Sequence, residues 1–350
     1  MDLNLERVVS WKVPDRFRRI VTIDTHTGGE PLRTIVSGFP ELQGQTILER
    51  RRFVQQNLDA LRKVLMWEPR GHADMYGCIV TPPERDDSDF GVLFLHNEGY
   101  SSMCGHGIIG VVTALIETGA LSVDGNVVDL RIDAPAGLIQ ASAYVENGRV
   151  RRVSFENVPS WVVELDANVV LEDGTRVRYD LAFGGAFYAY VDGAQFDEPI
   201  RCLPGEHDRI VSLGRAIKHA VMKSRQIVHP ESEDLGFLYG TIFVSPPVDS
   251  KNHSRNCCVF ADGEVDRSPT GTGVSGRIAL HVARGECTLN ESISIESLVG
   301  SRFDVQAVRE VDYFGQRAVI PLVTGDAFIT GRHEFLSEPD DPMAEGFCLR

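Results

Sequence analysis

A short glycine-rich motif occurs twice in this sequence, and its two copies differ at one chemically important position. The first copy is Cys104-Gly105-His106-Gly107 and the second is Thr270-Gly271-Thr272-Gly273, each followed by a stretch that favours a helix. The separation is 270 − 104 = 166 residues, and at the same separation Gly110 matches Gly276. A duplicated site predicts two related halves that face each other. One half carries a thiol that can ionise near neutral pH and the other an alcohol that cannot, so the pair provides a single base.

Weaker matches on both sides of the motif follow the same order in the two halves. Upstream, residues 23–29 match residues 179–185, and downstream residues 132–137 resemble residues 295–300. Each match is short, so their shared order is the evidence for a duplication.

The boundary between the halves is expected near residue 170. We assign residues 1–170 to the first half, with Cys104, and residues 171–334 to the second half, with Thr270. Residues 335–350 contain a turn-like segment at 338–342, and it stays open whether they return to the first half.

The pattern along the chain predicts an α/β fold. Most segments are short β-branched or alternating runs bounded by Gly, Asn, Asp and Pro, which is typical of strands. Amphipathic helices are expected at residues 45–66 and 208–228. Residues 108–116 are apolar almost all round, and such a helix must be buried on all sides. We therefore predict two pseudo-symmetric halves, each a curved sheet or barrel around a central buried helix, with the active site in the cleft between them.

Composition excludes several classes of partner. The net charge of −15 over 350 residues argues against nucleic acid, because phosphate binding requires clustered Lys and Arg. No stretch approaches the roughly 18 apolar residues of a membrane span, and residues 1–20 do not resemble a secretory signal. The seven cysteines are odd in number and lack CxxC spacing, which is typical of reduced thiols. We expect a cytoplasmic protein with a small-molecule ligand and neither a membrane nor a nucleic-acid partner.

Both copies of the motif also fit the G-x-G-x-x-G spacing of dinucleotide-binding folds. That interpretation is disfavoured, because the fingerprint needs its first glycine directly after a strand, whereas residues 97–104 separate the first copy from the strand that ends near His96. A Cys-x-His metal site lacks further ligands at suitable spacing. We expect no metal. The glycines would instead let two facing helix N-termini clamp one carboxylate with their backbone N–H groups.

Cys104 is expected at the first turn of the first of these helices. A helix N-terminus lowers a thiol pKa from about 8.5 towards ~3.5–7.5, which predicts a useful thiolate fraction at neutral pH. The alternative is a small buried hydrophobic residue, the usual fate of a free cysteine. The flanking Gly and His favour the reactive form, whereas Cys257 and Cys258 lie in an apolar run and are assigned to the core. For Asp266 and His106, ligand binding and local structural hydrogen bonding both stay open.

Four motifs, taken together and in order, resemble signatures of the proline racemase family over nearly the whole chain. They are residues 24–31 (Asp-Thr-His-Thr-Gly-Gly-Glu-Pro), 69–72 (Pro-Arg-Gly-His), 103–107 (Met-Cys-Gly-His-Gly) and 266–269 (Asp-Arg-Ser-Pro). The resemblance implies a cofactor-independent enzyme of two pseudo-symmetric α/β halves, similar to diaminopimelate epimerase, with the substrate between them.

The same resemblance implies a substrate-binding set around a catalytic Cys104. Its members are Asp266 and His106 at the ring nitrogen, the backbone of Gly105, His106, Gly271 and Thr272 at the carboxylate, and Tyr76 and Phe260 packed on the ring.

At one position this chain departs from the racemases and 4-hydroxyproline epimerases of the family. Those enzymes carry a second catalytic cysteine where Thr270 stands, and the departure is similar to the trans-3-hydroxy-L-proline dehydratases, as are residues 96–102 and 232–235. It implies a hydro-lyase that forms Δ1-pyrroline-2-carboxylate with Cys104 as its single base, and a homodimer would be ordinary for the family. The alternatives are a 4-hydroxyproline epimerase or proline racemase with an unrecognised second acid, and a non-catalytic amino-acid binding protein.

Overall fold

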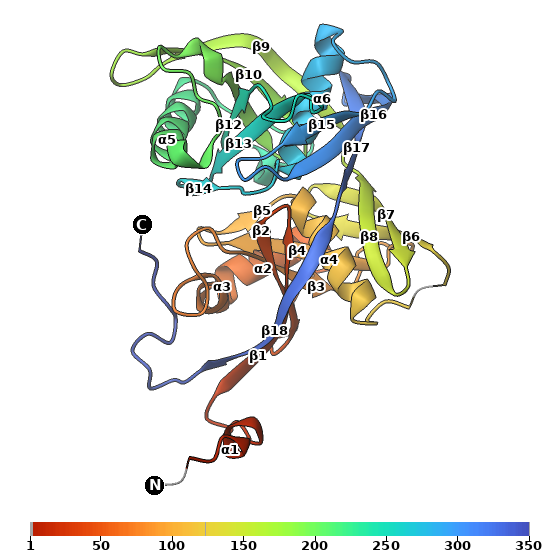
Figure 1. Cartoon of the computed structure of the whole chain (residues 1–350), viewed down its shortest axis with the longest axis vertical. Helices are drawn as coiled ribbons and strands as arrows, with labels where there is room; N and C mark the ends of the chain where they lie inside the picture. The colour runs from red at the N-terminus through yellow and green to blue at the C-terminus, as the bar shows by residue number, and fades with distance from the viewer. Residues whose placement is uncertain (1–2, 123, 350) are drawn as a thin grey trace.

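The computed structural model describes residues 3–122 and 124–349 of the chain. Figure 1 shows two halves stacked along the long axis, with strands running from one to the other. The first half contains β1 (Arg18–Thr27), β2 (Glu30–Ser37), β3 (Tyr76–Thr81), β4 (Phe90–His96), β5 (Tyr100–Ser101), β6 (Val127–Ala134), β7 (Gly137–Glu146), β8 (Arg149–Glu156) and β18 (Ala327–Ser337). The second contains β9 (Ser160–Val170), β10 (Arg176–Phe183), β11 (Phe187–Asp192), β12 (Leu238–Ser245), β13 (Ser254–Phe260), β14 (Glu264–Val265), β15 (Ile293–Glu296), β16 (Arg302–Tyr313) and β17 (Gln316–Gly325).

The two halves repeat one order of strand pairing. In the first half, β1–β2 is antiparallel, β2–β3 parallel, β3–β4 antiparallel, β4–β6 parallel, and β6–β7 and β7–β8 antiparallel. The second half repeats these directions from β10 to β17, again skipping one two-residue strand, β14. The predicted α/β fold of two pseudo-symmetric halves is therefore confirmed.

Strands are exchanged between the halves. β8 continues into β9, which pairs with β10, and β17 continues into β18, which pairs with β1. β17 also pairs with β9, so the second sheet closes on itself around its helix. The last residues lie against the first half, where Glu68 and Phe347 form an isolated bridge. The division at residue 170 stays a prediction, because strands pair across it.

Apart from α1, which lies near the N-terminus, the α-helices occupy equivalent places in the two halves. The helices are α1 (Glu6–Val9), α2 (Ile47–Asn57), α3 (Asp59–Met66), α4 (Gly105–Glu117), α5 (His207–Ser224) and α6 (Gly271–Arg284). α2 and α3 make the crossover from β2 to β3, and α5 makes the one from β11 to β12. The single helix expected at residues 45–66 is thus two helices, interrupted at Leu58. None of the described helices is both long and apolar enough to span a membrane.

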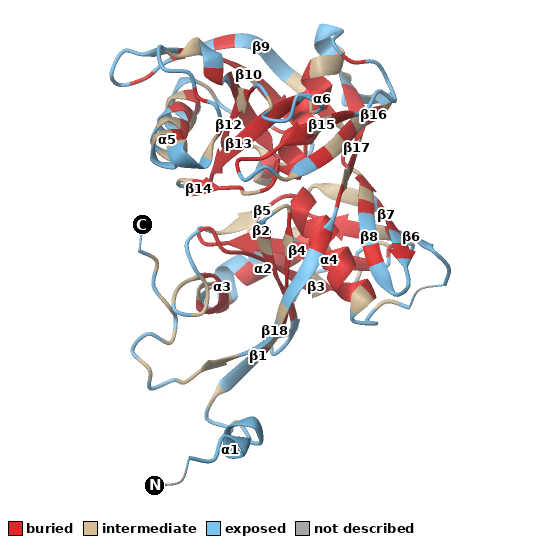
Figure 2. Cartoon of the chain, in the orientation of Figure 1, coloured by how far each residue is buried: buried red, intermediate tan, exposed pale blue. Residues whose placement is uncertain are grey.

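α4 and α6 are the central helices of their halves. α4 is buried from Gly105 to Ile116 and packs against strands on all sides, as its apolar composition predicts (Figure 2). α6 packs against β9, β10, β11, β16 and β17 in the same manner. The central position of both helices places their N-termini at the interface between the halves.

Two buried carboxylates show how closely the halves correspond. Asp133, in β6, accepts hydrogen bonds from two successive backbone N–H groups of the β3–β4 loop at 2.7 and 3.1 Å. Glu296, in β15, accepts two from the β12–β13 loop at 2.9 and 2.8 Å. Each carboxylate holds the loop of a hairpin by hydrogen bonds, and the second strand of that hairpin precedes a central helix. The chain segment before each helix N-terminus is therefore positioned in the same way in the two halves.

The two central helices meet through glycine. A Cβ atom placed on Gly271 would lie 2.5 Å from the Cα of Gly105, and one on Gly105 would lie 2.5 Å from the Cα of Gly271. Because no side chain fits there, both residues must be glycine for the helix N-termini to approach this closely.

We predict that Gly271→Ala lowers the free energy of unfolding by about 1–3 kcal/mol, because the added methyl group forces the halves apart. The control is Gly99→Ala, where a Cβ meets no atom within 4 Å. Differential scanning calorimetry should show a lower Tm for the first variant only. Equal Tm values would contradict the close helix contact.

Candidate active site

A small closed cavity lies where the two central helices meet. Its volume is about 20 Å³. It is lined by Tyr76, Met103, Cys104, Gly105, His106, Tyr188, Tyr239, Cys258, Phe260, Asp266, Thr270, Gly271 and Thr272. The structure thus brings together all nine site residues expected from the sequence. The cavity is smaller than an amino-acid ring, so a ligand of that size would fit only if the lining residues moved apart.

Cys104 is the N-cap residue of α4. Its extended backbone (φ −146°, ψ 110°) turns the side chain back over the first turn, where the N–H of Gly107 donates to Sγ at 3.2 Å. This is the position in which the helix dipole favours a thiolate. The sulfur of Cys104 therefore lies at the start of α4, as the sequence predicted.

The pKa of Cys104 is nevertheless raised in this structure, whereas the sequence predicted that it would be lowered. Burial raises it well above the ordinary thiol value, and the hydrogen bond from Gly107 offsets only part of that effect. The carboxylates of Asp266 and Glu30 raise it further. The predicted lowering of the Cys104 pKa is wrong for this structure, because desolvation of the thiolate outweighs the effect of the helix N-terminus. A positively charged ligand group would shift the balance back towards thiolate.

His106 lies beside this thiol in the first turn of α4. Its Nδ1 is 3.1 Å from Sγ of Cys104. Burial lowers the pKa of His106 to about 3, although hydrogen bonding to the backbone of Pro31 opposes the shift. The ring is therefore neutral at physiological pH, so it can exchange hydrogen bonds with the thiol without adding charge to the cavity.

Asp266 supplies the carboxylate of the second half. Its Oδ1 accepts a hydrogen bond from the N–H of Ser268 at 2.7 Å. Burial raises the pKa of Asp266 to about 6, while the hydrogen bonds from Ser268 act in the opposite direction. At neutral pH the group is mostly ionised and buried, which suits it to hold an ammonium ion.

Glu30 fixes the segment that carries Asp266. It is fully buried in the first half, and its carboxyl accepts a hydrogen bond from the N–H of Arg267 at 2.7 Å. The Arg267 side chain returns to the first half and pairs with Asp74 at 2.7 Å. These bonds join the halves next to the cavity, so closing the cleft also places Asp266.

Thr270 stands opposite Cys104 as the N-cap residue of α6. Its φ of +68° is in the left-handed region, which is unusual for a β-branched residue and costs on the order of 1–3 kcal/mol. Its buried hydroxyl makes no hydrogen bond of ordinary geometry to a described residue, but it lies near enough to Asp266 and Cys258 to lower the pKa of each. The hydroxyl therefore belongs to the polar wall of the cavity that Asp266 also forms.

Aromatic rings from strands of both halves form part of the cavity wall. The rings of Tyr239 and Phe260 stack at 5.4 Å, and the ring of Tyr76 meets that of His106 edge-on at 4.7 Å. Tyr76 and Phe260 thus lie on the cavity, as the resemblance implied. Tyr239 and Tyr188 were not anticipated from the sequence.

Cys258 also lines the cavity, which corrects part of its assignment to the core. It is fully buried, as expected, but it lies two residues before Phe260 on β13 and so shares that residue's face. Strand alternation in the sequence could have revealed this. Burial raises the pKa of the Cys258 thiol well above its ordinary value.

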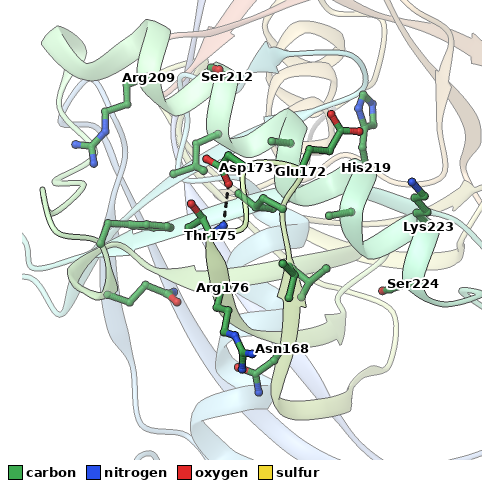
Figure 3. A pocket seen from close by; sticks show the side chains of 18 of the residues that line it. Asn168, Glu172, Asp173, Thr175, Arg176, Arg209, Ser212, His219, Lys223 and Ser224 are labelled. Carbon is green, nitrogen blue, oxygen red and sulfur yellow. Dashed lines mark hydrogen bonds between the residues drawn. The ribbon is translucent and has the colours of Figure 1, made fainter.

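A much larger cavity, of about 1490 Å³, lies between the β9–β10 hairpin and α5 (Figure 3). Its labelled side chains carry both signs of charge, for example Asp173, Arg176 and Lys223. None of its lining residues belongs to the predicted site. Among the described residues, no group of three or more His, Cys, Asp or Glu side chains could hold a metal ion.

Comparisons with known proteins agree with this arrangement. The family model described as proline racemase matches residues 22–348. A protein from Colwellia psychrerythraea named trans-3-hydroxy-L-proline dehydratase is 48% identical over 336 residues, covering 96% of this chain and 94% of its own. A protein from Burkholderia multivorans named 3-hydroxyproline 2-epimerase is 42% identical over 333 residues, covering 95% and 99%. The chain belongs to the proline racemase family.

A solved structure supports the same relationship at the level of the fold. A hydroxyproline epimerase from Agrobacterium vitis, with bound trans-4-hydroxy-L-proline, superimposes with a TM-score of 0.89 at 31% identity, covering 97% of this chain and 96% of that one. As a member of the proline racemase family, the protein is an enzyme, and the family resemblance predicted from its motifs is confirmed.

The raised pKa of Cys104 leads to a prediction about its reactivity. Alkylation of Cys104 by iodoacetamide should accelerate steadily from about pH 6 to about pH 9 in the ligand-free protein, because the thiolate alone reacts. Mass spectrometry of the Cys104 peptide gives the rate, and the partly exposed Cys348 in the same digest serves as an internal reference for alkylation. A rate that already levels off below about pH 7 would indicate a lowered pKa instead.

Proposed function

We propose that this enzyme is a trans-3-hydroxy-L-proline dehydratase that eliminates water to give Δ1-pyrroline-2-carboxylate. The observation that carries the proposal is the asymmetry of the two N-cap positions, where Cys104 faces the cavity from one helix and Thr270 from the other. Inversion at Cα needs a base on one face and an acid on the opposite face, whereas elimination needs only the first. The Colwellia relative named for this activity supports the same conclusion.

The stereochemistry of the substrate suits a single base. In the trans isomer the 3-hydroxyl is opposite the carboxylate, so it lies on the same face of the ring as the Cα hydrogen. Cys104, as a thiolate, removes that hydrogen, and the hydroxyl leaves from the same side. The first product is an enamine, which tautomerises to the cyclic imine.

The remaining cavity residues provide charge where the reaction needs it. A helix leaves its first N–H groups without partners inside the helix, and here these include Gly105 and His106 in α4 and Gly271 and Thr272 in α6. Held between them, the carboxylate is stabilised as negative charge develops on it during proton abstraction. Ionised Asp266, with His106, holds the protonated ring nitrogen, which acidifies the Cα hydrogen and favours the Cys104 thiolate.

A second candidate function is epimerisation at Cα. Cys258 gives it specific support, because this second thiol lines the cavity in the half that lacks the usual catalytic cysteine. The Burkholderia relative named 3-hydroxyproline 2-epimerase is also similar to this chain. The two functions differ in product, since an epimerase returns an inverted hydroxyproline rather than a cyclic imine.

Cys104→Ser should reduce dehydration by about 10²–10⁴-fold, because a serine hydroxyl is a far weaker base than a thiolate at neutral pH. The assay incubates trans-3-hydroxy-L-proline with the enzyme and reduces the cyclic imine to proline for quantification. Cys348→Ser, which changes a half-exposed thiol, is the matched control and should keep full activity. Turnover of Cys104→Ser near that of the control would refute the assignment of the base.

Thr270→Cys should introduce an acid on the opposite face of the ring and so produce some inverted hydroxyproline. Chiral chromatography of the reaction mixture measures it, with Thr270→Ser as the control that keeps a hydroxyl. The yield is expected to be modest, because the backbone of residue 270 stays in the left-handed region. Absence of any inverted product would mean that further residues separate the two reactions.

Two further expectations stay predictions. A homodimer is expected from the family resemblance, and light scattering of the purified protein tests it. The expected cytoplasmic location is tested by fractionating cells that express the full chain.

A further inference from the structure

Three buried hydroxyl groups form one hydrogen-bonded chain at the aromatic wall of the cavity. Tyr76, at the start of β3, donates to Ser101 in β5, and Ser101 Oγ lies 2.6 Å from the hydroxyl of Tyr239 in β12. The exposed fractions of the three residues are 2%, 1% and 7%. Tyr76 and Tyr239 line the cavity from opposite halves, and Ser101 joins their hydroxyls. The roles described above use the ring of Tyr76 but none of these three hydroxyl groups.

The phenol of Tyr76 also acts on the catalytic sulfur. Hydrogen bonding by Tyr76 lowers the pKa of Cys104, although burial has the larger and opposite effect. Conversely, after burial, the charge of Cys104 is the largest influence that raises the pKa of Tyr76. The geometry agrees, because the ring of Tyr76 meets that of His106 at 4.7 Å and the Nδ1 of His106 is 3.1 Å from the sulfur of Cys104. Tyr76 and Cys104 therefore both lie beside His106.

The proposed elimination needs an acid on that side. Hydroxide is a poor leaving group unless a proton reaches it as the C3–O bond breaks. Since the Cα hydrogen and the 3-hydroxyl share one face of the ring, the acid must stand beside the base. Thr270 and Cys258 belong to the opposite half, whereas Tyr76 belongs to the half of Cys104.

We propose that Tyr76 is the acid that protonates the departing 3-hydroxyl, with Ser101 and Tyr239 as positioning residues behind it. This inference rests on the proposed dehydratase function. The thiolate of Cys104 takes the Cα proton, and that electron pair forms the Cα–C3 double bond as the C3–O bond breaks. The hydroxyl proton of Tyr76 passes to the leaving oxygen, which departs as water. The phenolate then recovers a proton from the Cys104 thiol, so the proton lost from Cα balances the one in water.

Ser101 and Tyr239 make this transfer easier by reversing their hydrogen bonds. Either oxygen of the Ser101–Tyr239 pair can be the donor. When Tyr76 turns its proton towards the substrate, Ser101 can donate to the phenol oxygen while accepting from Tyr239. The developing phenolate is then stabilised by a buried donor, which replaces the water excluded from the closed site.

The test compares leaving groups in Tyr76→Phe. With trans-3-hydroxy-L-proline, kcat should fall by about 10²–10⁴-fold, the usual contribution of a general acid. With trans-3-fluoro-L-proline the leaving group is fluoride, which departs without being protonated, so fluoride release should stay within about threefold of wild type. Ser101→Ala and Tyr239→Phe should show the same selectivity with smaller losses.

Tyr100→Phe is the matched control, because Tyr100 is next to Ser101 but its hydroxyl donates to Asp59 at 3.0 Å, outside the cavity. It should leave both reactions unchanged. If Tyr76→Phe lost activity equally on both substrates, Tyr76 would have a purely structural role and the proposal would be overturned. If the variant kept full activity on both substrates, the proposal would be overturned as well. Wild-type enzyme that forms no cyclic imine from the hydroxy substrate would instead overturn the dehydratase function, and the inference with it.

Discussion

The contact between Gly105 and Gly271 is the constraint on which the rest of the site depends. Because each central helix begins with glycine, the two N-termini approach until a Cβ on either would lie 2.5 Å from the other backbone. Their unpaired N–H groups then converge on one point, where a carboxylate can be held by both halves at once. The N-cap residues, Cys104 and Thr270, are necessarily brought to the two sides of that point. Helix packing therefore places Cys104 and Thr270 at the cavity, while strands β3, β11, β12 and β13 supply its tyrosine and phenylalanine rings.

Closing the site has an electrostatic consequence. The two halves are joined beside the cavity by the bond from the Arg267 N–H to Glu30 and, farther away, by the ion pair of Arg52 with Asp234 at 2.8 Å. The closed cavity removes Cys104 and Asp266 from water, and burial raises the pKa of both. Burial in this cavity therefore favours the protonated thiol of Cys104 over the thiolate. In the proposed mechanism, the ammonium group of the ligand would favour the Cys104 thiolate, so that ligand binding and activation of the base would be coupled.

The sequence predicted the parts of this structure that follow from its duplicated glycine motif and from the apolar pattern of its helices. The glycines after Cys104 and Thr270 indicated two helix N-termini facing each other, and the apolar residues 108–116 indicated a helix buried on all sides. The exchange of β9 and β18 between the halves left no signal, since a strand has the same pattern whichever sheet it joins. The raised pKa of Cys104 also could not be predicted, because it depends on how completely the cleft closes.

Some cavity residues that the sequence analysis did not predict could have been found from the duplication or from strand alternation. Tyr239 precedes Gly240 in β12 as Tyr76 precedes Gly77 in β3, and each glycine pairs with the following antiparallel strand. Cys258 shares a strand face with Phe260, which strand alternation predicts. Ser101 is different, since only the folded structure brings its hydroxyl between two tyrosines from separate halves.

The central claim is that one base acts from one face of the ring, and proton exchange in heavy water tests it most directly. L-Proline fits the same clamp but has no hydroxyl to lose, so the enzyme can only remove and return its Cα hydrogen. The account predicts deuterium at Cα with the L configuration retained, measured by NMR and chiral chromatography. Accumulation of D-proline would contradict it, because inversion requires a second acid on the opposite face.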